Sequence, residues 1–373
     1  MAQALFVILL ILGALGAVLF TLRRRGWMRN GYFTIGASIV IAFMVMIVYQ
    51  SLAPILMLIL PGGATDNPRL LLAMNSIAQL TVLVGGTFFL IRATEQDVNA
   101  TLRFEGVMET PLRLYLLGPL IMLCTTIVFG GISQFWVKLL EYLPFYDEIE
   151  ALNKINEEAI ETLTKANNLG DLAVIFLAVA IVPAIAEEVF FRGFLQTNIE
   201  RSGHGRARPY VALTIASIIF GAVHVSPFQL PGLIGLGLAM GYMTYRTNNL
   251  TLGVLAHAFN NGLFVLAGYS MGSLPDESKM AEELEPVMLI TAIVMGAVGL
   301  AMLIRLFHFW SEPIMARGYA DEELRRTTVL NAAEELELYN SRLMADLEAH
   351  DREMQEKRPT DSERNNPDDK SFH

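Results

Sequence analysis

The sequence has little charge and almost no cysteine, and both shortages limit the class of protein. Only 17% of the 373 residues are charged, whereas 53% are hydrophobic. A soluble domain of this length carries more charge, so the composition indicates a protein with many membrane-spanning segments. The single cysteine, Cys124, excludes an intramolecular disulfide framework and a cysteine-based zinc site.

An excess of basic residues is absent too. The formal net charge is −10, and residues 321–373 alone contain 15 acidic and 8 basic side chains. The negative charge therefore belongs mostly to the carboxyl-terminal tail. Nucleic-acid-binding domains carry a basic patch or stripe, so we expect no nucleic-acid partner.

Apolar runs of membrane-spanning length, in contrast, are frequent. Each has close to the roughly 20 residues that cross the hydrocarbon core of a bilayer. They predict an all-α polytopic transmembrane bundle of about nine spans, at residues 4–22, 34–60, 70–92, 114–136, 171–196, 209–225, 230–246, 250–269 and 286–308. The run at 209–225 is short and could be partly re-entrant.

The arginines predict the orientation of these spans. The first run has no basic residue before it and Arg23, Arg24 and Arg25 directly after it. These flanks are the reverse of a cleavable signal peptide, so we expect an uncleaved span with its amino end outside. If the spans alternate from there, the inside loops collect most arginines and the carboxyl tail is cytosolic. The pattern fits a bacterial plasma membrane protein.

Composition divides the chain into five segments. Residues 146–170 alternate acidic and apolar side chains at helical spacing and predict an amphipathic connector outside the membrane. Residues 321–357 show a heptad pattern with Asn340 and His350 at core positions, which predicts either self-pairing into a homo-oligomer or a single helix on the cytosolic face. The segments are N-terminal transmembrane helices (1–145), the connector (146–170), a transmembrane core (171–310), a cytosolic amphipathic helix (311–357) and a disordered tail (358–373).

Three ionisable side chains interrupt the run at 171–196. A charge near the bilayer centre is costly, so Glu187, Glu188 and Arg192 need partners or a function. Glu188 and Arg192 are four residues apart and share one helix face, which predicts an ion pair. Glu187 points about 100° away from Glu188 and stays available as a base. Pro183, four residues before Glu187, leaves the carbonyl of Val179 without its helical partner.

Two further spans carry histidine. His224 ends the motif Phe-x-x-x-His, and His257 begins His-x-x-x-Asn, whose last residue is Asn261. His257 and Asn261 are one helical turn apart, so both side chains can donate to a developing oxyanion. Counted along the helices, Glu187 and His257 lie roughly 15 and 11 Å from the inner surface, whereas His224 lies deeper, at about 22 Å.

The three motifs together resemble the CPBP family, which comprises the CAAX prenyl endopeptidases and the bacteriocin-processing and Abi-like membrane proteases. The resemblance covers about residues 170–265 and includes all three motifs complete. It implies an intramembrane endopeptidase that cuts a membrane-associated peptide or protein near the cytosolic side of the membrane. In this family's pattern Glu187 and His224 would activate water, and His257 and Asn261 would stabilise the oxyanion. Glu188 and Arg192 would be structural charge partners.

Cofactor use and two other functions stay open at this point. The family is commonly described as metalloproteases, and Glu187, His224 and His257 could supply a zinc ligand set. A metal-free mechanism makes better use of Asn261, which is a poor zinc ligand, and the spacing His-Glu-x-x-His is absent. A proton-coupled secondary transporter, or a catalytically inactive scaffold of the same family, would carry similar intramembrane charges.

Overall fold

The computed structural model describes residues 26–59, 67–203, 207–271 and 286–356, and isolated positions at 13, 16, 20 and 205. Side chains are described up to residue 316, except at 57–59, and at a few positions beyond it. Most of the predicted first span and the whole predicted disordered tail lie outside the described residues. The chain forms two compact units, Met1–Met315 and Ala316–His373, and the site described below lies in the first.

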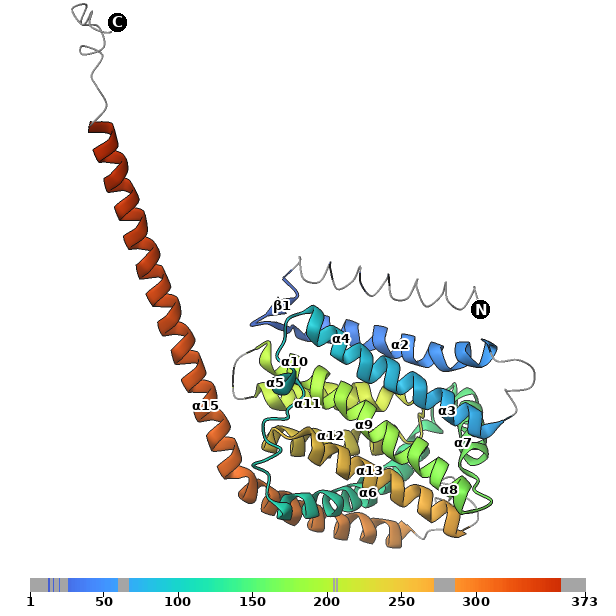
Figure 1. Cartoon of the computed structure of the whole chain (residues 1–373). Helices are drawn as coiled ribbons and strands as arrows, with labels where there is room; N and C mark the ends of the chain where they lie inside the picture. Colours follow the sequence, from blue (N-terminus) through green and yellow to red (C-terminus); the bar gives the residue numbers. More distant parts are fainter. Residues whose placement is uncertain are drawn as a thin grey trace, which may run out of the picture. The chain divides into compact units, whose positions relative to one another are not determined.

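The described part of the chain is almost entirely helical, as its composition predicted (Figure 1). A short hairpin, β1 (Met28–Arg29) with β2 (Tyr32–Phe33), precedes the helices. The first half contains α2 (Ile35–Ile59), α3 (Pro68–Ala78), π-helical η2 (Gln79–Gly85), α4 (Gly86–Ala93), α5 (Val98–Thr101), α6 (Leu112–Leu140) and α7 (Tyr146–Thr164). The second half contains α8 (Leu169–Ile175), π-helical η3 (Phe176–Ile181), α9 (Val182–Glu188), π-helical η4 (Val189–Gln196), α10 (Thr197–Arg201), α11 (Arg208–Val223), α12 (Leu230–Thr247), α13 (Leu250–Met271) and α15 (Pro286–Glu356).

Six helical stretches in the described residues are long and apolar enough to cross a membrane. They are Ile35–Leu56, Pro68–Ala93, Leu112–Leu140, Leu169–Arg201, Leu250–Met271 and Pro286–Ala316. The shorter α11 and the glycine-rich α12 correspond to two further predicted spans. The predicted total of nine also counts the first apolar run, which lies outside the described residues, so that number stays a prediction.

One helical rod, Leu169–Arg201, carries the acidic pair and forms the interior of the bundle. The side chain of Asn168 caps its start by accepting a hydrogen bond from the backbone N–H of Asp171. Within the rod, η3 and η4 enclose the short α9, which begins next to Pro183. All eight residues of η4 are buried, and η2, α11 and α13 pack around α9 and η4 (Figure 1). Arg192 therefore lies on the fully buried η4, and Glu187 and Glu188 end the α9 segment directly before it.

Aromatic rings fill the space around this rod. Phe190, Phe191 and Phe194 of η4 are fully buried, and Phe191 meets Phe220 of α11 edge to face at 5.2 Å between ring centroids. Lipid offers no hydrophobic driving force between helices, so close packing of these rings contributes through dispersion. This packing fixes α11 against the rod, and α11 ends at His224.

The predicted connector and the predicted cytosolic helix each lie mostly within one long helix of the structure. The connector at 146–170 contains α7, whose first turn carries Asp147 and Glu148. The predicted boundary at 310/311 falls inside α15, which continues without interruption from Pro286 to Glu356. The heptad side chains at 329, 333, 336, 343, 350 and 354 lie outside the described side chains, so self-pairing of the tail stays a prediction.

Candidate active site

Glu188, Arg192 and His257 form a buried charged cluster. Nη1 of Arg192 lies 2.7 Å from Oε1 of Glu188, at the four-residue spacing that predicted the pair. Nδ1 of His257 lies 3.1 Å from the same carboxylate oxygen. The carboxylate is completely buried, and both partners are nearly so. A buried carboxylate needs such partners, because an unpaired charge in the interior is strongly destabilising.

Two glycines make room for this cluster. Nη2 of Arg192 donates to the carbonyl of Gly237 on α12 at 3.2 Å. A Cβ atom at Gly253 would lie only 3.0 Å from Oε2 of Glu188. The glycines therefore allow two neighbouring helix backbones to approach the ion pair closely.

Glu187 has different surroundings from its neighbour. Its Oε2 atom is buried and has no hydrogen-bond partner among the described residues. Nε2 of His224 lies 3.9 Å from this oxygen. This distance is too long for a direct hydrogen bond, and both atoms face the same space. Oε2 of Glu188 also lacks a hydrogen-bond partner, but Oε1 of Glu188 is held by Arg192 and His257, so Glu187 is the less firmly paired of the two carboxylates.

His224 is oriented by its own helix. Its Nδ1 atom lies 2.6 Å from the carbonyl oxygen of Phe220, one turn earlier. A carbonyl can only accept, so Nδ1 carries a proton, and in the neutral tautomer that this bond selects Nε2 is an acceptor on the side of Glu187. The ring of Phe220 also contacts His224, His257 and the guanidinium of Arg192, with centroid distances of 4.7, 5.9 and 4.5 Å. Phe220 therefore separates and supports the two polar groups.

A cavity of about 310 Å³ adjoins Glu187 and His224. Two of its polar lining residues, Tyr49 and Gln50, come from α2, far from the motifs in sequence. The complete lining is Met46, Tyr49, Gln50, Leu83, Glu187, Phe191, Val223, His224 and Val225. A concave site with converging polar groups and an unpartnered carboxylate is the expected form of an active site.

Sequence reasoning missed the contribution of α2. The hydroxyl of Tyr49 donates to Oδ1 of Asn75 at 3.1 Å, and Nε2 of Gln79 donates to the same hydroxyl at 3.1 Å. The signal was present in the sequence, because Tyr49, Gln50, Asn75 and Gln79 interrupt apolar spans. Polar side chains at membrane depth mark an interior or a wet cavity.

Asn261 and His257 do not line this cavity. Nδ2 of Asn261 donates to the carbonyl of Val179 at 3.2 Å. This is the carbonyl that Pro183 was predicted to leave without its helical partner, so the asparagine satisfies it from the neighbouring helix. The structure therefore pairs Glu187 with His224, groups Glu188 with Arg192 and His257, and places Asn261 on the backbone of η3.

The predicted zinc ligands do not converge. In the described part of the chain no three His, Cys, Asp or Glu side chains are arranged to hold a metal ion. Glu187 and His224 approach each other, but His257 directs Nδ1 at Glu188 instead. A catalytic zinc needs three converging protein ligands, so the set Glu187, His224 and His257 does not fit one in this arrangement.

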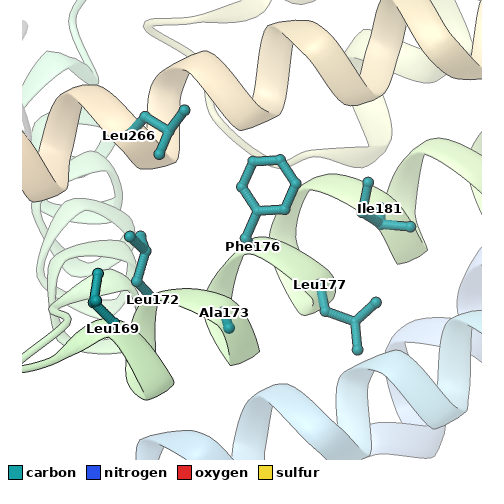
Figure 2. Close-up of a pocket in the computed structure, with 7 residues that line it drawn as sticks. All are labelled: Leu169, Leu172, Ala173, Phe176, Leu177, Ile181 and Leu266. Carbon is teal, nitrogen blue, oxygen red and sulfur yellow. The ribbon is translucent and has the colours of Figure 1, made fainter.

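A second, larger cavity of about 440 Å³ lies between the start of the rod and α13. Figure 2 shows its lining side chains, Leu169, Leu172, Ala173, Phe176, Leu177, Ile181 and Leu266, all of which are hydrocarbon. None can donate, accept or transfer a proton. The cavity fits an apolar chain and offers no chemistry of its own.

Comparison with known proteins supports the resemblance that the motifs suggested. Residues 169–263 match the family model described as type II CAAX prenyl endopeptidase Rce1-like. This match covers 95 of the 373 residues and supports the similarity to the CPBP family of intramembrane proteases. Together with the six apolar helices it supports an integral membrane protein. No curated protein matches the chain. No solved structure matches it either.

Proposed function

We propose that the chain is an intramembrane endopeptidase of the CAAX type in which Glu187 activates the attacking water. The observation that carries the proposal is the cavity where the unpartnered Oε2 of Glu187 faces Nε2 of His224 at 3.9 Å. The family match supports the class of reaction. A general base needs to reach the water proton directly, and this pair offers two acceptors around one water position.

In the proposed reaction, Glu187 takes one proton from water while the water oxygen attacks the carbonyl carbon of the scissile peptide bond. His224 orients that water through Nε2. When the tetrahedral intermediate breaks down, Glu187 returns the proton to the leaving amine. The products are one new carboxyl end and one new amino end, and the glutamate is regenerated.

The oxyanion donors remain those that the resemblance implied, His257 and Asn261. The Nδ1 proton of His257 is directed at Glu188, so its Nε2 can donate when the ring is an imidazolium held by that carboxylate. Asn261 uses one amide hydrogen on Val179 and keeps a second. Both donors would have to reach the substrate carbonyl once a peptide occupies the cavity.

The depth of Glu187 and His224 along their helices supports a cut within the membrane. Glu187 lies 14 residues before Arg201, or about 21 Å along the helix, and His224 ends the α-helix that starts at Arg208, about 24 Å away. These arginines mark the end of the bundle that was predicted to be cytosolic. We therefore propose cleavage in the membrane interior, deeper than the cytosolic surface that the sequence predicted.

The proposal is tested by comparing cells that express the wild-type protein with cells that express Glu187→Gln, using quantitative membrane proteomics. A precursor that accumulates only with Glu187→Gln, and whose new terminus appears only with the wild type, would support the protease and name its substrate. Lys154→Ala, an exposed change on α7, is the matched control.

Two results would contradict the proposal. Proton uptake into proteoliposomes that depends on Glu187, without a precursor, would favour the proton-coupled transporter. An unchanged membrane proteome with no proton flux would favour the inactive scaffold.

A further inference from the structure

The backbone on both sides of His224 is held by amide side chains from distant elements. Nε2 of Gln50, on α2, donates to the carbonyl of Val223 at 2.9 Å. Nδ2 of Asn156, on α7, donates to the carbonyl of Val225 at 2.7 Å. Both donors lie outside residues 169–263, so the family motifs do not include them.

The turn that these two bonds enclose is strained. Val225 has a φ of +51°, and it is the only β-branched residue with positive φ in the described part of the chain. A branched side chain is unfavourable in this conformation, which persists only where its surroundings enforce it. The strained residue follows His224 directly, so the chain turns sharply where α11 must end for the ring to face Glu187.

The surroundings of this turn are themselves fixed. Nε1 of Trp136 on α6 donates to the carbonyl of Pro227 at 2.9 Å, and the ring of Tyr146 on α7 stacks on Phe228 with 6.3 Å between centroids. Arg69 ties the other end of α7 by donating to the carbonyl of Leu163 at 2.9 Å. Figure 1 shows α7 beside α3 and α8 at one end of the bundle. Asn156 therefore reaches Val225 from a helix that is anchored at both ends.

The hydrogen bond from Gln50 to Val223 satisfies an amide on an otherwise apolar helix. The residue is exposed on the apolar helix α2 and lines the cavity beside Glu187 and His224. An amide without a partner there would be costly, and the carbonyl of Val223 is the partner that the structure supplies.

We infer that Gln50 and Asn156 are positioning residues that clamp the backbone at Val223 and Val225 and so set His224 against Glu187. The inference rests on the proposed function for its effect on catalysis, but the clamp itself is a property of the fold. Neither amide touches the reacting atoms. The clamp also assigns a role to α2 and α7, because each supplies one of its two halves.

The first experiment measures the clamp without any substrate. Hydrogen–deuterium exchange of the full-length protein in nanodiscs should be faster at amides 223–229 in Asn156→Ala and in Gln50→Leu than in the wild type. Lys154→Ala, two residues before Asn156 and exposed, should leave this segment unchanged. Unchanged exchange in both clamp variants would overturn the inference.

The second experiment measures the effect on catalysis, with an internally quenched farnesylated CAAX peptide as the probe. Asn156→Ala and Gln50→Leu should each lower kcat about 10- to 100-fold with little change in KM, because a misplacement of about 1 Å can cost that much. In a His224→Ala background neither change should lower the rate further, since the clamp acts only through His224. Equal losses in both backgrounds would show a general structural role and overturn the inference.

A rescue completes the test. Glycine adopts positive φ without strain, so Val225→Gly should restore part of the kcat lost in Asn156→Ala. No recovery would contradict a clamp that holds a strained turn. If the wild type does not cleave the probe while the exchange results hold, the proposed function fails for this substrate class and the clamp stands.

Discussion

Glu187 and Glu188 are adjacent in sequence, yet their carboxylates have different partners. Glu188 is completely buried, with Oε1 held by Arg192 and His257, whereas Glu187 lines the cavity and lies 3.9 Å from His224. The difference arises from the 100° that separates successive residues on a helix. One carboxylate therefore stabilises the fold, and the other remains available for chemistry.

These environments predict different outcomes for two substitutions. Glu187→Gln keeps the volume and removes the base, so the protein should accumulate in the membrane normally and lose cleavage. Arg192→Ala leaves Glu188 as a buried charge with a weaker set of partners, a loss of about 3–5 kcal/mol that should lower the amount of protein. Immunoblots of membranes, read beside the cleavage assay, check both. Loss of protein in Glu187→Gln with normal Arg192→Ala would reverse the roles.

Residue spacing accounts for part of this arrangement. The separation of four residues predicted the ion pair of Glu188 with Arg192, because both positions belong to one helix. The contact of His257 with Glu188 could not be predicted in this way, since it depends on how α13 packs against the rod. Gln50 was missed for the same reason. Spacing fixes relations within a helix, and packing alone fixes those between helices.

At the scale of elements, the glycines of α12 do more than reduce the distance between helices. Gly237 and Gly241 are four residues apart, a spacing of small residues that lets helices approach closely. In the structure the carbonyls of these glycines also accept hydrogen bonds from Arg192 and Gln196, at 3.2 and 3.0 Å. The two donors on η4 and the two acceptors on α12 match because both pairs are spaced four residues apart. The glycine repeat thus contributes acceptors to the buried polar groups of the rod.

A methyl group at Gly237 should disrupt this contact. Its Cβ would lie 2.9 Å from the Cβ of Ser217 on α11, closer than packing allows. We expect Gly237→Ala to lower stability by about 1–3 kcal/mol, as overpacking does. Gly130→Ala on α6, where nothing lies within 4 Å, should be neutral or stabilising because alanine favours a helix. Thermal unfolding of both variants in detergent measures the difference, and an equal effect of the two would contradict the account.

The π-helical stretches could not be predicted from the sequence. Apolar periodicity identified the rod as one span, and all of Leu169–Arg201 is helical. The periodicity has no signal for η3 or η4, because a π-helix changes hydrogen-bond partners and not the apolar character of the residues. Pro183 gave a partial signal, since it predicted an unsatisfied carbonyl at Val179.

At the scale of the whole molecule, the orientation in the membrane stays a prediction that rests on the arginines alone. Cysteines introduced singly at Ser273 and Ser362, both outside the described residues, test it in a Cys124→Ala background. An impermeant thiol reagent added to intact cells should label Ser273→Cys and leave Ser362→Cys unlabelled until the cells are opened. The opposite labelling pattern would reverse the predicted orientation. The arginine-rich end of the bundle would then lie outside the cell.

The length of the rod limits how this segment can change during evolution. Removing or adding one residue in a helix rotates everything beyond it by about 100°. Between Asn168 and Arg201, such an event would turn Glu187 out of its cavity or separate Glu188 from Arg192. The length of the rod is therefore as strictly determined as the identity of its charged residues. Single-residue insertions and deletions should be excluded there and tolerated in the surface loops between helices.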